Sequence, residues 1–190
     1  MDKYCLPDKY VHRTENTFFD DTPFTDEYQY EVYDVAFKTV VNHNFNSILD
    51  IGTGGGYKLI KYFSDYNTLG IDIEPTLSFL RTKYPDRNWG KFEDIDSEFD
   101  LVICSDVIEH IPEPDGFIKN ILELEFKMIV FSTPDRDTLY GGVTVGPPSN
   151  TAHVREWTIN EFFCYISKYF KIVNQYKFEP NTQVVLCKKI

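Results

Sequence analysis

The chain has 190 residues, a formal net charge of −11, an apolar fraction of 42% and an aromatic fraction of 16%. This composition indicates one globular domain with a large core and argues against disorder. Proteins that bind nucleic acids usually need a basic face for the phosphates, so the acidic charge and the lack of a Lys/Arg run predict no nucleic-acid partner. We expect a neutral or cationic small molecule as the partner, and the sequence does not indicate an oligomeric state.

The sequence predicts a cytoplasmic protein that does not enter a membrane. No apolar segment of the secretory type follows the N-terminus, and no apolar stretch approaches the ~18 residues of a membrane span. Cys104 and Cys187 sit in apolar runs, so we expect buried thiols, which fit a reducing compartment. The other two cysteines, Cys5 and Cys164, form no Cys-x-x-Cys pair with them or with each other.

No metal site is expected from the sequence. The cysteines and histidines show no zinc-like spacing. Adjacent acidic residues occur at 20–21 and 93–94, but two neighbouring side chains rarely point to one ion.

The rhythm of the chain predicts alternating strands and helices after an N-terminal segment. Residues 1–26 are polar and aromatic without clear periodicity, and residues 27–42 have the spacing of an amphipathic helix. Strand-like runs follow at 47–51, 67–72, 88–92, 99–105 and 127–132, and helix-like runs lie between them at 55–64, 76–84 and 115–124. Alternation of this length predicts a parallel sheet with right-handed crossovers.

The rhythm breaks after Thr133. Residues 134–157 are rich in glycine and proline and are predicted to form a long irregular loop, a kind of loop that is usually functional. Thr158 is expected to cap a helix, with Glu161 completing a capping box. Runs at 170–174 and 183–187 predict a terminal antiparallel hairpin. We divide the single predicted domain, residues 1–190, into an N-terminal lid and helix, a core, a substrate loop, and a C-terminal helix with hairpin: 1–45, 46–133, 134–157 and 158–190.

The most informative segment reads Asn-Ser-Ile-Leu-Asp-Ile-Gly-Thr-Gly-Gly-Gly at residues 46–56. A buried strand that runs into a glycine-rich turn and a helix start is typical of a nucleotide-like ligand site, because glycine lets the backbone approach the ligand. A dinucleotide fingerprint needs a third glycine five residues after Gly52, where Tyr57 stands, so that fingerprint fails. The pattern that fits is acid-x-Gly-x-Gly-x-Gly, from Asp50 to Gly56.

This pattern resembles motif I of the class I S-adenosylmethionine (SAM) methyltransferases. The segment 69–75 looks like the end of that family's second strand, 129–134 like the end of its fifth, and 99–110 is similar to the fourth-strand segment of the ubiquinone-biosynthesis group, where a Glu-His pair follows. The resemblance covers about 46–133 well and the hairpin loosely. Residues 146–158 are similar to a segment of methyltransferases associated with glycan and sugar modification.

The resemblance implies a Rossmann-like, doubly wound α/β fold with seven strands, mostly parallel and ending in an antiparallel hairpin. It implies SAM as cofactor and S-adenosylhomocysteine (SAH) as product. Asp72 would accept hydrogen bonds from the ribose hydroxyls. Asp94 is favoured over Glu93 for adenine, and Asp50 would bind the methionine end or hold the turn. The implied cofactor residues are Asp50, Gly52, Thr53, Gly54, Gly56, Asp72, Ile73, Asp94 and Ser105.

The candidate catalytic residues are His153, His110 and Asp106. His110 follows a strand whose carboxyl end faces the ligand edge of such sheets, and His153 belongs to the predicted substrate loop, so either imidazole could be a base. A structural role remains open for both. His12 and His43 are expected to be structural or surface residues. We expect the segment 155–157 (Arg-Glu-Trp) to anchor the loop.

The resemblance therefore predicts a SAM-dependent methyltransferase that acts on a small molecule, by O-methylation of a sugar or similar polar metabolite. A hydroxyl is a poor nucleophile and gains about 10²–10⁴-fold from a general base. Two alternatives stay open: N- or C-methylation of another metabolite, and a SAM-binding protein without transfer activity.

Overall fold

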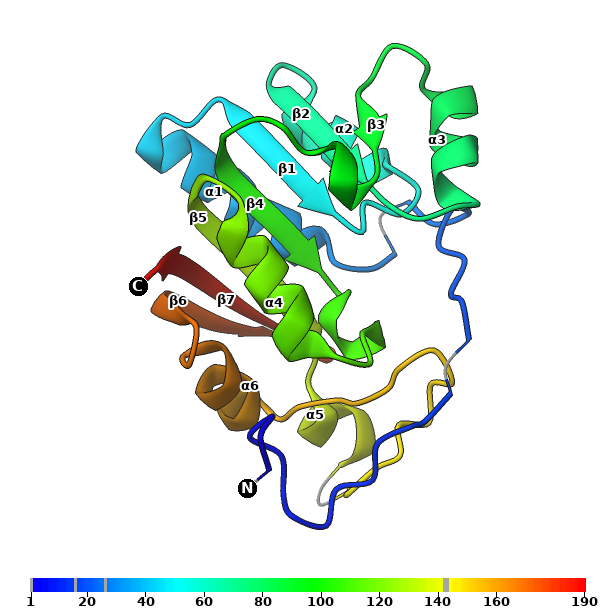
Figure 1. The fold of residues 1–190 in the computed structure, drawn as a ribbon, viewed down its shortest axis with the longest axis vertical. Coiled ribbons are helices and arrows are strands. Elements are labelled where there is room, and N and C mark those ends of the chain that lie inside the picture. The colour runs from blue at the N-terminus through cyan, green and yellow to red at the C-terminus, as the bar shows by residue number, and fades with distance from the viewer. Residues whose placement is uncertain (1, 16, 26, 142–143) are drawn as a thin grey trace. The chain divides into compact units, whose positions relative to one another are not determined.

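The structure is a computed structural model that describes residues 2–15, 17–25, 27–141 and 144–190 (Figure 1). The chain forms two compact units. The first unit comprises Asp20–Ser105 and Leu124–Val130, and the second comprises Met1–Phe19, Asp106–Glu123 and Phe131–Ile190. Among the described residues, no helix has the length and apolar character needed to cross a bilayer.

The first unit is built on four parallel strands in the order β3-β2-β1-β4. Their side chains are apolar on both faces, as parallel strands covered by helices require, and Ile48, Leu49 and Val102 are fully buried. Helix α1 packs on α2 and β4, and α3 packs on β3 (Figure 1). The elements are α1 Tyr30–His43, β1 Ser47–Ile51, α2 Tyr57–Phe63, β2 Asn67–Ile71, α3 Thr76–Lys83, β3 Trp89–Gly90, the 3₁₀ turn η1 Phe92–Asp94, and β4 Phe99–Ser105.

The second unit carries the C-terminal hairpin, in which β6 pairs antiparallel with β7 through a bulge near Ile172. Its N-terminal residues run beside the long loop: the amide of Val11 donates to the carbonyl of Val145, and that of Arg13 to Val154 (Figure 1). The elements are η2 Ile108–His110, α4 Pro114–Glu123, α5 Arg136–Tyr140, α6 Ile159–Ile166, β6 Phe170–Phe178 and β7 Thr182–Lys189.

Strand β5, Phe126–Pro134, begins in the first unit and ends in the second. Among the described residues, seven strands form one sheet in the order β3-β2-β1-β4-β5-β7-β6. The reversal of order on the two sides of β1 and the final antiparallel hairpin confirm the predicted Rossmann-like, doubly wound fold class.

Several local predictions are confirmed. Strands β1 and β4 have the predicted bounds. Thr158 caps α6, and Glu161 returns the capping-box bond to the Thr158 amide at 2.9 Å. His43 ends α1 and is exposed, as expected of a surface residue. Cys104 and Cys187 are buried thiols.

Other predictions need correction. Strand β3 is shorter than the predicted 88–92 because the Asp94 carboxylate accepts the Lys91 amide at 2.8 Å and turns the chain into η1. The loop 134–157 is not wholly irregular: Asp135 accepts the Asp137 amide at 3.2 Å and so caps α5. A disulfide that the sequence did not indicate joins Cys5 to Cys164.

Candidate functional site

The glycine turn follows β1 in the first unit. Gly52, Gly54 and Gly56 have φ of 71°, 54° and 70°, so the chain enters α2 through conformations that side chains disfavour. The backbone of Gly54 also packs closely against Asp21. A Cβ placed at Gly54 would lie only 1.9 Å from Oδ2 of Asp21, so no side chain fits there unless Asp21 moves. The alternating glycines of the sequence motif are therefore required by backbone geometry.

Asp72 follows β2 and holds the glycine turn from one side. Its Oδ2 accepts the amide of Gly54 at 2.9 Å, and its Oδ1 accepts the amide of Ile73 at 2.7 Å. Burial raises the pKa of Asp72. Burial, followed by the charge of Asp72, raises the pKa of Asp21 to about 6. Two close carboxylates beside bare backbone favour a cationic ligand.

Asp50 is fully buried at the end of β1. Its Oδ2 accepts hydrogen bonds from the hydroxyls of Tyr33 and Thr53, both at 2.8 Å, so Asp50 holds the turn against α1. Its Oδ1 has no hydrogen-bond partner among the described residues. Burial raises the pKa of Asp50 to about 6. These bonds are those that the holding role requires, and a contact of Asp50 with the methionine end of SAM stays a prediction.

The remaining predicted cofactor residues are spread over the same unit. Ser105 ends β4, whose Cys104 is paired with Ile51 of β1, so Ser105 lies at the edge where the glycine turn begins. Ile73 is 63% exposed. Asp94 is exposed and lines an open hollow of about 430 Å³ beside β3, and no other predicted cofactor residue lines that hollow.

The second unit gathers His110 and His153, which come from η2 and the long loop. Their rings meet edge to face with centroids 4.8 Å apart. Nδ1 of His110 lies 2.9 Å from the carbonyl oxygen of Ala152, and Nδ1 of His153 lies 2.6 Å from Oε1 of Glu156. His153 is 7% exposed, which is not the solvated loop residue that the sequence allowed. The two candidate bases therefore form one cluster.

Glu109 completes this cluster. It is fully buried, and one ligand atom from each of Glu109, His110 and His153 lies within 4.8 Å of the others, a set that could hold a metal ion. Burial and the charge of Asp106 raise the pKa of Glu109 well above its usual value. Burial and His153 lower the pKa of His110 to about 4, so its imidazole is neutral at pH 7. Sequence spacing could not reveal the set, because its members come from two distant segments.

Asp106 stands at the start of the second unit in a left-handed conformation, with φ of 50°. Its amide donates to the carbonyl of Ser132 at 3.2 Å, and its Oδ1 accepts the Ser132 hydroxyl at 2.6 Å. These bonds fix the residue after β4 against β5. The charge of Asp106 also contributes to the raised pKa of Glu109.

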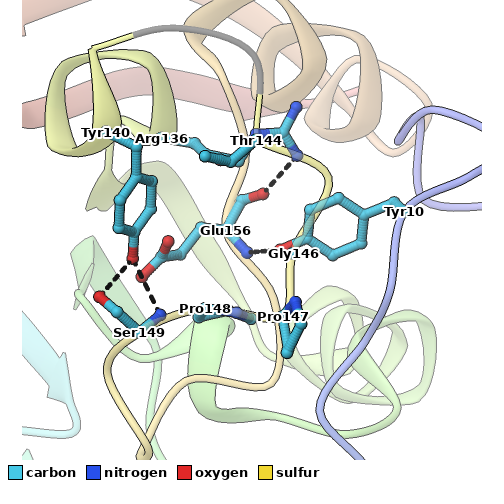
Figure 2. Close-up of a pocket in the computed structure, with 9 residues that line it drawn as sticks. All are labelled: Tyr10, Arg136, Tyr140, Thr144, Gly146, Pro147, Pro148, Ser149 and Glu156. Carbon is cyan, nitrogen blue, oxygen red and sulfur yellow. Dashed lines mark hydrogen bonds between the residues drawn. The ribbon is translucent and has the colours of Figure 1, made fainter.

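A cavity of about 250 Å³ lies in the second unit (Figure 2). Arg136 crosses one wall, donating to the carbonyl of Glu156 at 3.2 Å and to Glu161 at 2.8 Å. Oε2 of Glu156 has no hydrogen-bond partner among the described residues, while Oε1 contacts His153. Glu156 thus joins the cavity to the histidine cluster. The lining residues are Tyr10, Arg136, Tyr140, Thr144, Gly146, Pro147, Pro148, Ser149 and Glu156.

The Arg-Glu-Trp segment anchors the loop as expected, but not through an ion pair between its own members. Arg155 donates to the carbonyls of Ile111 and Pro112 at 2.6 and 2.7 Å, and Trp157 donates to the carbonyl of Tyr4 at 2.9 Å. Glu156 contacts His153 instead, a contact that was not predicted from the sequence. The His-x-x-Glu spacing was the available signal.

The fold and the match to a methyltransferase family model together define a SAM-dependent methyltransferase, with SAM as cofactor. The chain belongs to the family described as "Methyltransferase domain", whose model matches residues 25–175. A search of curated proteins found no match.

Solved structures of methyltransferases have the same fold. Magnesium protoporphyrin IX methyltransferase from Synechocystis, solved with SAH, is 16% identical, with a TM-score of 0.65 over 85% of this chain and 83% of that one. The 1,6-didemethyltoxoflavin-N1-methyltransferase of Burkholderia thailandensis, also with SAH, is 17% identical, with a TM-score of 0.61 over 83% and 78%. The small RNA methyltransferase HEN1 is 24% identical, with a TM-score of 0.65 over 93% of this chain but only 26% of that one.

Proposed function

We propose that this methyltransferase transfers the methyl group of SAM to a hydroxyl oxygen of a sugar or a similar polar metabolite. The observation that carries the proposal is the second-unit cavity (Figure 2). One of its lining residues, Glu156, contacts His153 of the histidine cluster. Four of the lining residues carry a hydroxyl group: Tyr10, Tyr140, Thr144 and Ser149. A cavity rich in hydroxyls suits a ligand that both donates and accepts hydrogen bonds.

The unpartnered polar atoms of the cavity support the same ligand class. Oε2 of Glu156, Oγ1 of Thr144 and Nε of Arg136 are buried without a hydrogen-bond partner among the described residues. A buried polar group without a partner costs about 1–3 kcal/mol, which a bound ligand would recover. One carboxylate acceptor and one guanidinium donor at fixed positions favour a polyhydroxylated acceptor over an apolar one.

The cofactor contacts belong to the same proposal. We assign the ribose hydroxyls to Asp72 with Ile73 beside it, adenine to Asp94, and the methionine end of SAM to the glycine turn and Ser105. The close carboxylates of Asp72 and Asp21 would favour the positive charges of SAM.

Chemistry explains why the acceptor oxygen needs a polar site. The oxygen attacks the methyl carbon opposite the departing sulfur, and alignment of the two reactants can contribute an effective molarity of roughly 10⁵–10⁸ M. A hydroxyl must also lose its proton, so His110, His153 and Asp106 are the residues we assign to activation. An amine acceptor would need less help from this cluster to lose a proton.

A small acceptor is favoured over RNA, although HEN1 shares the fold. The net charge of −11 opposes a phosphate backbone. Membership of the ubiquinone-biosynthesis or sugar-modifying group remains part of the proposal. The same is true of the cytoplasmic location, which the Cys5–Cys164 disulfide does not favour.

The experiment is a methyl-transfer screen. The protein is incubated with SAM and separate pools of hydroxylated, amino and oligoribonucleotide compounds, and SAH release and methylated products are followed by mass spectrometry. We expect SAH release with the hydroxylated pool. The methylated product should be stable in mild acid and should not react with amine-specific reagents. Transfer only to the amino pool or only to RNA would contradict the proposed acceptor class, and SAM binding without any transfer would favour a non-catalytic protein.

A further inference from the structure

We propose that Glu109, His110 and His153 bind one divalent first-row transition-metal ion. The three side chains belong to the second unit, and one ligand atom from each lies within 4.8 Å of the others. The site stands on three separate observations: a buried carboxylate without partners, the orientation of two imidazoles, and the spacing of the ligand atoms.

The Glu109 carboxylate is fully buried, and neither oxygen has a hydrogen-bond partner among the described residues. An ionised carboxylate in such a position costs several kcal/mol unless it is paired or coordinates a metal. The backbone carbonyl of Glu109 is occupied, because it accepts the amide of Val154 at 2.8 Å. The chain thus fixes the backbone of Glu109, while neither oxygen of its buried carboxylate has a hydrogen-bond partner among the described residues.

The histidine rings are held as metal-binding histidines are held. Metal-ligating histidines almost always donate the second ring N–H to a carbonyl or carboxylate. Nδ1 of His110 donates to the carbonyl of Ala152, and Nδ1 of His153 donates to Glu156. In the tautomers that donate from Nδ1, each ring carries its lone pair on Nε2. Nε2 of His153 accepts the Asn150 amide at 3.0 Å, a bond that an ion would replace.

The ligand atoms lie near enough to one another for a single ion to bind all three. Two ligands at about 2.1 Å from a tetrahedral ion lie about 3.4 Å apart. The 4.8 Å limit of this cluster exceeds that separation by about 1.4 Å. Rotations of the three side chains would bring their ligand atoms to bonding distance.

The donor set selects the class of ion. Two imidazole nitrogens and one carboxylate suit Mn²⁺, Fe²⁺, Co²⁺ or Zn²⁺ better than Mg²⁺ or Ca²⁺, which prefer oxygen ligands. No thiolate lies in the set, so a soft ion such as Cu⁺ is disfavoured. Three protein ligands leave positions open for water or an acceptor oxygen.

The role of the ion rests on the proposed O-methylation, whereas its binding does not. An acceptor hydroxyl on the ion would release its proton to solvent water, because a bound divalent ion lowers the pKa of such a group. The oxygen then forms a bond to the methyl carbon, and the carbon–sulfur bond breaks with its electron pair left on sulfur as SAH. No oxidation state changes.

The test is metal binding to the full chain after removal of ions by a chelator. Co²⁺ and Mn²⁺ are titrated by calorimetry, and the visible spectrum of the Co²⁺ form is recorded. We expect one ion per chain, and a loss of at least about 10–100-fold in affinity for Glu109→Gln and for His153→Ala. His43→Ala and Glu123→Gln, both at exposed positions, should bind as the wild type does.

Three outcomes would overturn the site: no binding by the wild type, equal binding by the double variant Glu109→Gln/His153→Ala, or loss of binding in His43→Ala. SAM affinity and far-ultraviolet circular dichroism check that each variant is folded. If a variant does not fold, pulsed electron paramagnetic resonance of the Mn²⁺-loaded wild type decides, because coordinated imidazole nitrogens must appear in it. If the ion binds but no methyl transfer is found, the proposed O-methylation is contradicted and the proposed metal site is still supported.

Discussion

Nδ1 of His153 lies 2.6 Å from Oε1 of Glu156, and both side chains are buried. The carboxylate fixes the tautomer and the direction of the imidazole, and Glu156 also lines the cavity (Figure 2). One glutamate thereby links the cavity assigned to the acceptor to the cluster assigned to its activation.

Glu156→Gln should lower turnover about 10–100-fold, because a neutral amide orients the imidazole less firmly than a carboxylate. Since Glu156 lies in the second unit, SAM affinity should stay unchanged. Steady-state kinetics with the acceptor from the screen, together with calorimetry of SAM, measure both. Equal turnover in Glu156→Gln and wild type would remove this positioning role.

Asp72→Asn should weaken SAM binding by about 1.5–3 kcal/mol, or roughly 10–100-fold, because charge-assisted hydrogen bonds to the ribose hydroxyls would be lost. Asp86→Asn is the matched control, since Asp86 is exposed. Calorimetry with SAH gives the affinities. Identical affinity in both variants would remove the ribose assignment.

Gly54→Ala should destabilise the protein by about 1–2 kcal/mol, because the new Cβ would occupy a left-handed conformation. The Asp21 carboxylate would also have to move, since its Oδ2 lies 1.9 Å from the Cβ position. The loss corresponds to a fall of roughly 2–8 °C in Tm by calorimetry. Gly116→Ala in α4 meets no atom within 4 Å and should gain about 0.5–1 kcal/mol. A fall of Tm in Gly116→Ala as large as in Gly54→Ala would refute the argument.

Asp50→Asn should remove a pH dependence of stability. Burial raises the pKa of Asp50 from 3.8 to about 6, so the folded state binds this proton more tightly than the unfolded state. The stability that protonated Asp50 contributes is therefore present below about pH 4 and lost as the pH rises to about 6. The difference in unfolding free energy between Asp50→Asn and wild type should grow by about 3 kcal/mol over this window in urea unfolding without SAM. A constant difference would show that Asp50 titrates normally.

Tyr140→Phe should raise the KM for the acceptor about 2–13-fold, because a neutral hydrogen bond contributes about 0.5–1.5 kcal/mol. The hydroxyl of Tyr140 lies 2.9 Å from that of Ser149 on the cavity wall (Figure 2). SAM affinity should not change. Tyr28→Phe, at a position 57% exposed, serves as the control. An unchanged KM in Tyr140→Phe would place the acceptor elsewhere.

The local sequence pattern was sufficient to predict the strands of the sheet and the glycine turn. The strands are short apolar runs bounded by turn residues, and this signal lies within each strand's own segment. The bounds of β1 and β4 could therefore be predicted to the residue. The capping box of α6 joins Thr158 to Glu161, only three residues on, and such a bond is visible in sequence. The positive φ of Gly52, Gly54 and Gly56 follows from the same local logic.

Contacts between distant segments were decided by the tertiary structure alone. His110 bonds to Ala152, 42 residues on, and Cys5 to Cys164, 159 residues on. Asp21 lies over Gly54 through the path of the N-terminal segment. No spacing rule encodes these pairs, because they depend on how loops without a hydrophobic period pack against the strands. The sequence by itself thus determined the fold and the glycine turn, whereas packing of the long loop decided that Glu109, His110 and His153 meet in one cluster.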